Sequence, residues 1–285
     1  MKARLYSSPV ITLTESATID HVLLKMQLNH IKTVVIQSEN KPIAVVTERD
    51  IVKFLENDKT KRALDEIELS EIMKKNPITI TEGQQDHFNQ CAMRMKTFKI
   101  GAIIVVDDDG DLVGITTKTD ITNAFSMLYP GKYKVKDYMS RKVATCRQSD
   151  SLKFVLNMLN RNCMSRLVVT DNDGNPEGVI TTNTFLRYFS NFKKASSKEA
   201  DDWNYLKFKI AMPVKAILHE DLLTVNQDED LAKAARLMID KIISGIPVVN
   251  KKKDLVGLIS KSDIVRAFDD VETHHILLEK YKLTH

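Results

Sequence analysis

The chain has 285 residues, enough for about two domains, and its 43% hydrophobic and 28% charged content is typical of a folded globular protein. Its 42 basic and 38 acidic residues leave a formal net charge of +4, so composition creates no strong electrostatic demand for nucleic acid. The longest apolar stretch, residues 100–106, is far too short to cross a bilayer, and neither common glycine-rich phosphate motif occurs.

A twelve-residue pattern that ends in threonine plus an apolar residue occurs four times along the chain. The copies cover residues 2–13, 69–80, 135–146 and 214–225, and their marker threonines are Thr12, Thr79, Thr145 and Thr224. Self-similarity at a fixed period is the signature of a repeat architecture. We therefore number four repeats in chain order.

Each marker precedes an amphipathic helix, two short β-branched strands and a second helix. Repeat 1 has the apolar helix face Ile19, Val22, Leu23 and Met26, strands 33–36 and 43–47, and helix 50–55. Repeat 2 has the face Phe88, Cys91, Ala92 and Met95, strands 102–106 and 112–117, and helix 120–128. Repeat 3 has the face Leu152, Val155, Leu156 and Leu159, with strands 166–169 and 178–181. Repeat 4 has the face Leu231, Ala234, Ala235 and Met238, strands 246–249 and 255–260, and helix 263–268.

A hydroxyl residue closes the last strand of every repeat. These residues are Thr47, Thr117, Thr181 and Ser260, which follow their markers by 35, 38, 36 and 36 residues. The longest spacing belongs to repeat 2, whose first helix fits the pattern only after a shift of two residues near Gly83. Two independent features thus agree on one insertion, which makes chance similarity a poor explanation.

A repeat of about 60 residues is too small to stand alone easily, so we expect the repeats to pair through their apolar sheet faces. The expected first domain is 1–128, with repeats 1–56 and 69–128. The expected second domain is 129–285, with repeats 129–190 and 211–270, a connector at 191–210 and a C-terminal helix at 271–285.

The ends of the repeats resemble the cystathionine β-synthase (CBS) domain family, whose signature ends in Gly-h-(h)-Ser/Thr-x-x-Asp-h, where h is an apolar residue. Repeat 2 has Gly114-Ile-Thr-Thr-Lys-Thr-Asp-Ile121 and repeat 4 has Gly257-Leu-Ile-Ser-Lys-Ser-Asp-Ile264, whereas repeat 1 begins this motif with Ala44. Residues 245–249, Gly-Ile-Pro-Val-Val, are similar to another family strand.

The resemblance implies an α/β (α+β) fold in which each repeat is a small three-stranded sheet with two amphipathic helices. It also implies that repeats pair into two pseudo-twofold Bateman modules with clefts between repeats. Two modules would form a disc, either within one chain or by dimerisation.

The hydroxyl-x-x-aspartate motif has two interpretations. In one, it is only a capping box that satisfies unpaired N–H groups at a helix start. In the other, the helix N-terminus and the hydroxyl face a phosphate, while the carboxylate accepts hydrogen bonds from the two hydroxyls of a ribose. In the family the aspartate does hold ribose, so the resemblance favours adenosine-type ligands in repeats 1, 2 and 4.

The residues that this interpretation implicates fall into three groups. The corner residues are Thr47, Arg49 and Asp50, then Thr117, Lys118 and Asp120, then Ser260, Lys261 and Asp263. The cations Arg49, Lys118 and Lys261 could set the number of phosphates bound in their own repeats, or they could equally be solvated surface charges. By resemblance, backbone near Ile11, Ile78 and Leu223 would border the base, with Lys32, Gly101 and Gly245 beside it. Ile246 and Pro247, of the Gly-Ile-Pro strand, are further ligand-binding candidates. Repeat 3 has Thr184 in place of the aspartate, which makes ribose binding doubtful there, although Thr181 and Arg166 could still serve a ligand held by a neighbouring repeat.

Catalysis is not expected, because the histidines form no HExxH motif and no GxSxG elbow is present. No metal site is expected either. We expect a regulatory sensor of AMP, ADP or ATP that signals to a regulated protein partner. The alternatives are a sensor of S-adenosylmethionine and an interaction scaffold with vestigial ligand sites.

Three further expectations concern the setting of the protein. The three cysteines form no CxxC pair, and residues 1–4 lack the apolar core of a signal peptide, so we expect a cytoplasmic protein. The assembly would be a homodimer or a self-closed disc. Neither a membrane nor nucleic acid is an expected partner, because no helix-turn-helix or basic stripe stands out.

Overall fold

The computed structural model describes residues 6–58, 62–84, 86–162, 164–193, 211–218 and 222–282. Repeat 1 contains β1 (Thr12–Leu13), α1 (Ile19–Leu28), β2 (Thr33–Ser38), β3 (Lys41–Thr47) and α2 (Glu48–Asn57). Repeat 2 contains β5 (Thr79–Thr81), α3 (His87–Phe98), β6 (Ala102–Val106), β7 (Leu112–Thr117) and α4 (Lys118–Leu128). Repeat 3 contains β8 (Thr145–Arg147), α6 (Leu152–Arg161), β9 (Arg166–Thr170), β10 (Pro176–Thr181) and α7 (Thr182–Lys193). Repeat 4 contains β11 (Val225–Asn226), α9 (Leu231–Asp240), β12 (Gly245–Val249), β13 (Leu255–Ser260) and α10 (Lys261–Lys282).

Each repeat forms a small mixed sheet with its own two helices, so the predicted fold class is confirmed. In every sheet the first strand runs parallel to the central strand and the last strand runs antiparallel to it. The sheet of repeat 1 has a fourth strand, β4 (Lys74–Lys75), which pairs with β3. The expectation of three strands is therefore wrong for repeat 1, because a strand from the start of repeat 2 adds to its edge.

The predicted helix faces are buried in repeats 1, 3 and 4 at the positions expected. In α3 of repeat 2 the buried residues are His87, Cys91, Ala92 and Met95. Phe88, predicted for this face, is partly buried and packs against the core from its edge. The two-residue shift is therefore confirmed, with His87 as the residue that replaces Phe88 inside.

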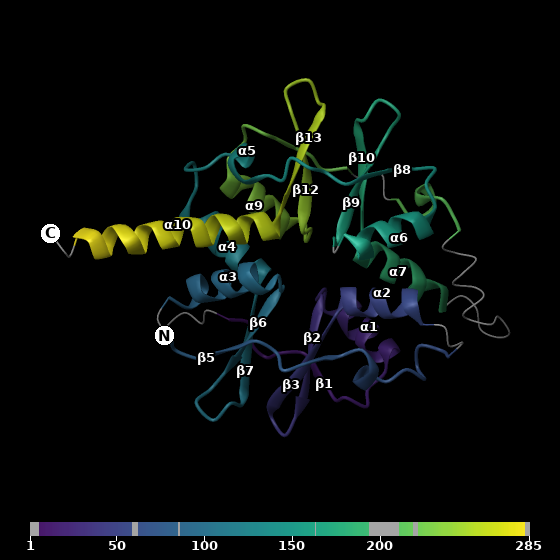
Figure 1. Cartoon of the computed structure of the whole chain (residues 1–285), viewed down its shortest axis with the longest axis vertical. Helices are drawn as coiled ribbons and strands as arrows, with labels where there is room; N and C mark the ends of the chain where they lie inside the picture. The colour runs from purple at the N-terminus through teal and green to yellow at the C-terminus, as the bar shows by residue number, and fades with distance from the viewer. Residues whose placement is uncertain are drawn as a thin grey trace. The chain divides into compact units, whose positions relative to one another are not determined.

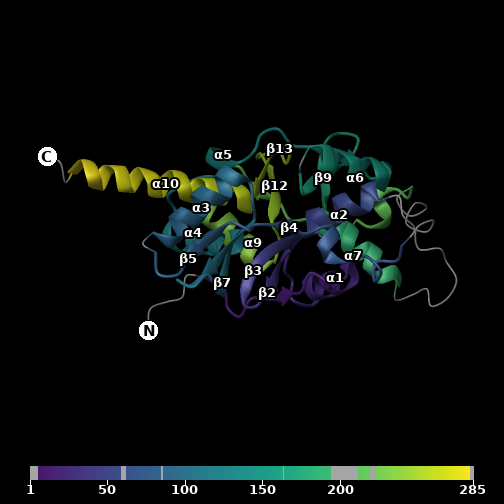
Figure 2. The ribbon, with the colours of Figure 1, turned by 60° about the horizontal axis from the view of Figure 1, so that its bottom comes forward.

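The apolar helix faces form two cores, each shared by two repeats. Compact unit 1 consists of residues 1–10, 78–143 and 223–285, and its core joins repeats 2 and 4. Compact unit 2 consists of residues 11–77 and 144–222, and its core joins repeats 1 and 3. Within unit 1, α10 lies against α3 and α4 (Figures 1 and 2), and within unit 2, α2 lies against α7.

These compact units do not coincide with the expected domains 1–128 and 129–285, since each unit takes residues from both sides of residue 128. The sequence pattern identified helix faces that must be buried, but a face rich in aliphatic residues does not specify which other face it meets. The pairing of sheet faces between repeats 1 and 2, and between 3 and 4, stays a prediction.

The first residues of each repeat pack against a different repeat. Ser7, near the start of repeat 1, exchanges backbone hydrogen bonds with Ile115 of β7 (2.9 and 3.1 Å). Ser140, near the start of repeat 3, does the same with Leu258 of β13 (2.9 Å each). The strand β4, near the start of repeat 2, pairs with β3 of repeat 1. We call residues 6–10, 69–77, 135–143 and 211–218 the lead segments.

The signature glycines make room for these lead segments. A Cβ at Gly114 would overlap the ring of Tyr6, one at Gly178 would lie 2.5 Å from Leu218 Cδ1, and one at Gly257 would lie 2.6 Å from Met139 Sδ. The glycine of the family signature is thus explained in this chain by side chains that cross from a lead segment.

The C-terminal end differs from expectation in one respect. The second helix of repeat 4 and the expected C-terminal helix at 271–285 are one helix, α10, which the structure describes to Lys282. Of the expected connector at 191–210, residues 194–210 lie outside the described residues, and residues 191–193 belong to α7.

The part of the chain that the structure describes contains neither a candidate membrane span nor a candidate metal site. None of its helices combines the length and the apolar character needed to cross a membrane. None of its groups of three or more His, Cys, Asp or Glu side chains could hold a metal ion.

The lead-segment packing predicts a specific sensitivity at Gly114. Gly114→Ala should lower the free energy of unfolding by about 1–3 kcal/mol, because the added methyl must displace the Tyr6 ring from a packed site. Chemical denaturation measures this change. Gly101→Ala is the matched control, since a Cβ there meets nothing within 4 Å. Equal effects of the two substitutions would contradict the packing role.

Candidate functional site

The four strand-to-helix corners share one backbone geometry. The N–H of the first helical residue donates at 3.1 Å to the carbonyl of the residue just before the central strand. The pairs are Glu48 with Lys32, Lys118 with Gly101, Thr182 with Ser165, and Lys261 with Ser244. The corners are therefore equivalent positions, and Ser244, rather than Gly245, corresponds to Lys32 and Gly101.

One carboxylate oxygen of each corner aspartate caps its own helix. The Oδ2 atom of Asp50 accepts from the Thr47 backbone N–H (3.0 Å) and hydroxyl (2.5 Å). Asp120 Oδ2 accepts the same pair from Thr117 at 2.7 Å each, and Asp263 Oδ2 accepts it from Ser260 at 2.9 and 2.6 Å. These bonds are part of the capping interpretation, so the aspartates have a structural role in all three repeats.

The other oxygen, Oδ1, faces a lead segment in each case. Asp50 Oδ1 forms a 2.5 Å ion pair with Lys74 of β4. Asp120 Oδ1 accepts from the Ser7 hydroxyl at 3.4 Å, which is a long hydrogen bond. The sequence pattern places Ser7, Lys74 and Ser140 at one equivalent position of the lead segments.

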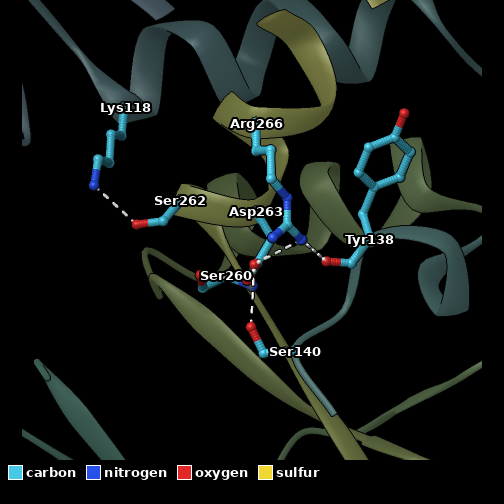
Figure 3. A network of polar contacts seen from close by, with 7 residues as sticks. All are labelled: Lys118, Tyr138, Ser140, Ser260, Ser262, Asp263 and Arg266. Atoms are coloured by element: carbon cyan, nitrogen blue, oxygen red, sulfur yellow. Dashed lines mark hydrogen bonds and ion pairs between the residues drawn. The ribbon is translucent and has the colours of Figure 1, made fainter. Parts of the chain in front are cut away.

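Around Asp263 the Oδ1 contacts are more numerous, as Figure 3 shows. The Ser140 hydroxyl donates to Oδ1 at 3.3 Å, and the Arg266 guanidinium approaches it at 3.3 Å. Arg266 also donates to the carbonyl of Tyr138, so it joins α10 to the lead segment. Asp263 is only 7% exposed. The three aspartates thus differ in what engages Oδ1, although their capping bonds are alike.

The corner of repeat 3 keeps the geometry without the charge. Thr184 Oγ1 accepts from the Thr181 backbone N–H at 3.1 Å and lies 3.0 Å from the Thr181 hydroxyl. A hydroxyl replaces the carboxylate in the cap, but it offers no second oxygen to a ligand. This agrees with the sequence-based doubt about ribose binding there.

The other predicted site residues lie near the starts of the first and central strands of their sheets. Ile78 directly precedes β5, and its carbonyl accepts from Ile104 at 3.1 Å. Ile11 has the equivalent bond from Val35, at 3.4 Å. Gly101 is exposed, Gly245 begins β12, and Leu223 is partly buried against the core of unit 1.

Two predicted residues of β12 have buried side chains. Ile246 is fully buried in the unit 1 core, and Pro247 next to it is buried as well. Their side chains therefore contribute to packing, whereas Gly245 at the start of the strand is partly exposed. Arg49, by contrast, is exposed at the second position of α2.

Unit 2 contains three interacting charged residues, Lys32, Glu48 and Arg166, whose association the sequence did not predict. Glu48 is only 6% exposed and accepts from the Asn183 side chain at 2.6 Å. Burial raises the pKa of Glu48, whereas the nearby Lys32 ammonium lowers it. Although solvent reaches the Lys32 side chain, the surrounding protein lowers its pKa, and the positive charge of Arg166 acts in the same direction.

Lys118 and Lys261 do not extend toward their own corners. Lys118 Nζ donates to the Ser262 hydroxyl at 2.8 Å (Figure 3), and Lys261 Nζ donates to the Thr119 hydroxyl at 3.0 Å. Each lysine therefore contacts the first turn of the helix that belongs to the other repeat of unit 1.

Sequence reasoning missed Ser7, Lys74, Ser140 and Arg266 as neighbours of the aspartates. The first three occupy the sixth position of the repeated twelve-residue pattern, directly after the residues Tyr6, Met73 and Met139. Their equivalence was visible in the sequence, but their proximity to an aspartate of another repeat was not, because local patterns carry no information about which repeat a segment crosses to.

Comparison with known proteins gives the family. The profile described as "CBS domain" matches residues 3–57, 69–127, 135–191 and 214–270. These four matches cover most of the chain, and the chain therefore belongs to the CBS domain family.

Several relatives extend this result. MJ1225 of Methanocaldococcus jannaschii is 25% identical over 279 residues, which are 91% of this chain and 95% of that protein. Its crystal structure, described as that of a candidate archaeal homologue of g-AMPK, aligns with 93% of this chain and 98% of its own at a TM-score of 0.80 and 23% identity.

Two further proteins match part of the chain. MJ1404 of the same organism is 32% identical over 188 residues, which are 62% of this chain and 44% of that protein. PAE2072 from Pyrobaculum aerophilum, a CBS domain protein solved in complex with AMP, covers 41% of this chain and 86% of its own at 29% identity and a TM-score of 0.36.

The capping geometry predicts different effects for two substitutions of Asp120. Asp120→Ala should lower the free energy of unfolding by about 1 kcal/mol, because the Thr117 N–H and hydroxyl lose their acceptor. Asp120→Asn should cost less, since its amide oxygen can still accept both bonds. Denaturant titration of the two variants checks this. Equal stability of Asp120→Ala and the wild type would contradict the capping role.

Proposed function

We propose that this protein is a non-catalytic sensor that binds an adenosine-containing ligand, AMP, ADP or ATP, at the corners of repeats 1, 2 and 4. The ligand's ribose hydroxyls would donate to the corner aspartate, and its phosphates would lie by the corner hydroxyl and the helix N-terminus. Membership of the CBS domain family supports this assignment, since the family places ribose on this aspartate.

The observation that carries the proposal is that the two oxygens of the carboxylate have different roles: Oδ2 caps the helix and Oδ1 does not. Because Oδ2 is fixed by the cap, the carboxylate keeps one orientation, in which Oδ1 meets a side chain of a lead segment. A carboxylate used only for capping has no need of a second oxygen. In repeat 2 that oxygen is engaged only by a hydroxyl at 3.4 Å among the contacts of the described residues, so a ribose would displace little.

The contacts of Oδ1 also rank the three corners by the rearrangement that ligand binding would require. Repeat 2 requires the smallest rearrangement. In repeat 4 a ribose would have to replace the contacts of Arg266 and Ser140 with Asp263 Oδ1. In repeat 1 it would have to replace the 2.5 Å ion pair between Lys74 and Asp50. Lys74 is 66% exposed in its side chain, so water can replace its partner at moderate cost. We propose that ligands fill repeat 2 first.

A ligand can regulate only by favouring one arrangement of the protein over another. The lead segments provide such a connection, since Ser7, Lys74 and Ser140 each join an aspartate of one repeat to the chain entering another. We propose that occupancy of a corner shifts its lead segment and is passed to a regulated partner protein, either in a homodimer or in a disc closed by one chain.

A reducing, cytoplasmic setting is part of the proposal. Cys91 and Cys146 are free buried thiols, and burial raises the pKa of Cys91 to about 11 and that of Cys146 to about 12. Thiols of this kind are inert and contribute to packing rather than to catalysis.

A second candidate function is an interaction scaffold whose corners are structural only. The capping bonds at every corner favour it, because they give each aspartate a role without any ligand. S-Adenosylmethionine remains an alternative ligand under the first proposal, since it shares the adenosine half.

Calorimetric titration with AMP separates these candidates. We expect AMP to bind the wild type and to raise its melting temperature. Asp120→Asn should weaken the tightest binding about tenfold, because a charge-assisted bond to ribose is lost while the cap is kept.

The matched control is Asp150→Asn, because Asp150 also accepts a backbone N–H, from Arg147 at 2.8 Å, but belongs to no corner. This variant should bind AMP like the wild type. Absence of binding by AMP, ADP and ATP, with S-adenosylmethionine tested in parallel, would contradict the nucleotide proposal and leave the scaffold.

A further inference from the structure

Two lysines of unit 1, one from each repeat, contact the corner of the other repeat. Lys118 is the first residue of α4 and Lys261 is the first residue of α10. The Lys118 ammonium donates to Ser262, which precedes Asp263, and the Lys261 ammonium donates to Thr119, which precedes Asp120. Each positive charge is therefore held at the aspartate corner of the other repeat, contrary to the sequence-based assignment of each lysine to its own repeat.

The arrangement is reciprocal, which makes it a property of the repeat 2 and repeat 4 pair. Equivalent positions donate and accept on both sides, with distances of 2.8 and 3.0 Å. The hydroxyl partners, Thr119 and Ser262, are exposed, so a solvent-borne anion can reach both ammonium groups. A phosphate would offer each lysine a charged acceptor in place of a neutral hydroxyl.

Unit 2 shows that the fold does not require these charges. The positions equivalent to the two lysines carry Glu48 and Thr182. Asn183, equivalent to Thr119 and Ser262, donates to Glu48 at 2.6 Å, which preserves the contact with the opposite sign of charge. Because the same register is built with a carboxylate there, the lysines of unit 1 call for an explanation other than packing.

The charges near Glu48 show a further difference between unit 2 and unit 1. Glu48 and Arg166 both act on the Lys32 ammonium: the Glu48 carboxylate raises the pKa of Lys32, and the Arg166 guanidinium lowers it. In unit 2 the cations thus share their surroundings with a buried carboxylate. In unit 1 the two lysines extend to hydroxyl groups, beside corners that carry the predicted ribose-binding aspartates.

We propose that Lys118 contacts the phosphates of a ligand held by Asp263, and that Lys261 contacts those of a ligand held by Asp120. The inference rests on the proposed function and adds its specificity determinant for unit 1. The nucleoside is recognised by the corner of one repeat and the phosphate by the lysine of the other. Phosphate recognition then depends on the joined pair of repeats 2 and 4, whereas nucleoside recognition depends on a single corner.

Variants with one active corner test this assignment. Asp50→Asn with Asp263→Asn leaves the Asp120 corner, and calorimetry measures its affinity for adenosine, AMP and ATP. Adding Lys261→Met should weaken AMP about fivefold and ATP more, and should leave adenosine unchanged. Adding Lys118→Met should leave all three affinities unchanged.

The mirror experiment uses Asp50→Asn with Asp120→Asn, which leaves the Asp263 corner. Here Lys118→Met should weaken AMP and ATP, and Lys261→Met should have no effect. Lys233→Met is the matched control, because Lys233 is an exposed lysine of unit 1 on α9 that pairs with Glu229. Thermal melting of every variant confirms that it folds.

The outcomes separate the inference from the function on which it rests. If the lysine of the same repeat controls phosphate affinity, or if neither lysine does while adenosine and AMP still bind, the crossed assignment is wrong and the proposed function stands. If the parent variants bind neither adenosine nor AMP, the proposed function fails and the crossed assignment fails with it.

Discussion

The candidate sites depend on the hydrogen bonds between a strand-ending hydroxyl residue and an aspartate three positions later. These bonds end the strand, start the helix and satisfy backbone N–H groups that would otherwise lack an acceptor at the helix start. They also fix the aspartate in one orientation, because Oδ2 accepts from both the backbone and the hydroxyl of the capping residue. A loose carboxylate would lose side-chain entropy on meeting a ligand, whereas a capped one has already lost it.

The orientation of the aspartate is the same at the three corners. The corners differ in the lead-segment side chain that meets the second carboxylate oxygen. The lead segments cross from one repeat to another, pass over the signature glycines and bring Ser7, Lys74 or Ser140 to the second carboxylate oxygen. The caps are alike, but Oδ1 meets a hydroxyl at Asp120, an ammonium group at Asp50, and both a hydroxyl and a guanidinium group at Asp263. This variation gives chemically different sites on one repeated backbone, and it links each site to a segment that belongs to another repeat.

Much of this fold could be predicted from the sequence, because its information is local. The strands β6, β7 and β13 occupy the predicted residues, and the shifted helix face of α3 was found from a two-residue discrepancy in spacing. The corner residues were found for the same reason, since a cap is a contact between residues three positions apart. The partners of the helix faces were not found, because Leu, Val and Ala on one face fit many other apolar faces.

The crossed contacts of Lys118, Lys261 and Lys74 were missed on similar grounds. Each joins residues that are distant in sequence, and an exposed lysine carries no pattern that indicates its acceptor. The departures within the repeats were more informative. Thr184 in repeat 3 and Glu48 in repeat 1 replace residues that repeats 2 and 4 share, and both keep the geometry while they change the charge.

The most direct test of the account is whether Asp120 Oδ1 and the ribose hydroxyls recognise each other. The affinities of AMP and of its 2′,3′-dideoxy analogue would be measured by calorimetry for the Asp50→Asn, Asp263→Asn protein, with and without Asp120→Asn. The account predicts that loss of the hydroxyls weakens binding about tenfold when Asp120 is present and has little further effect when it is replaced. Equal affinity of the two ligands for the protein that retains Asp120 would show that the carboxylate serves its own helix alone.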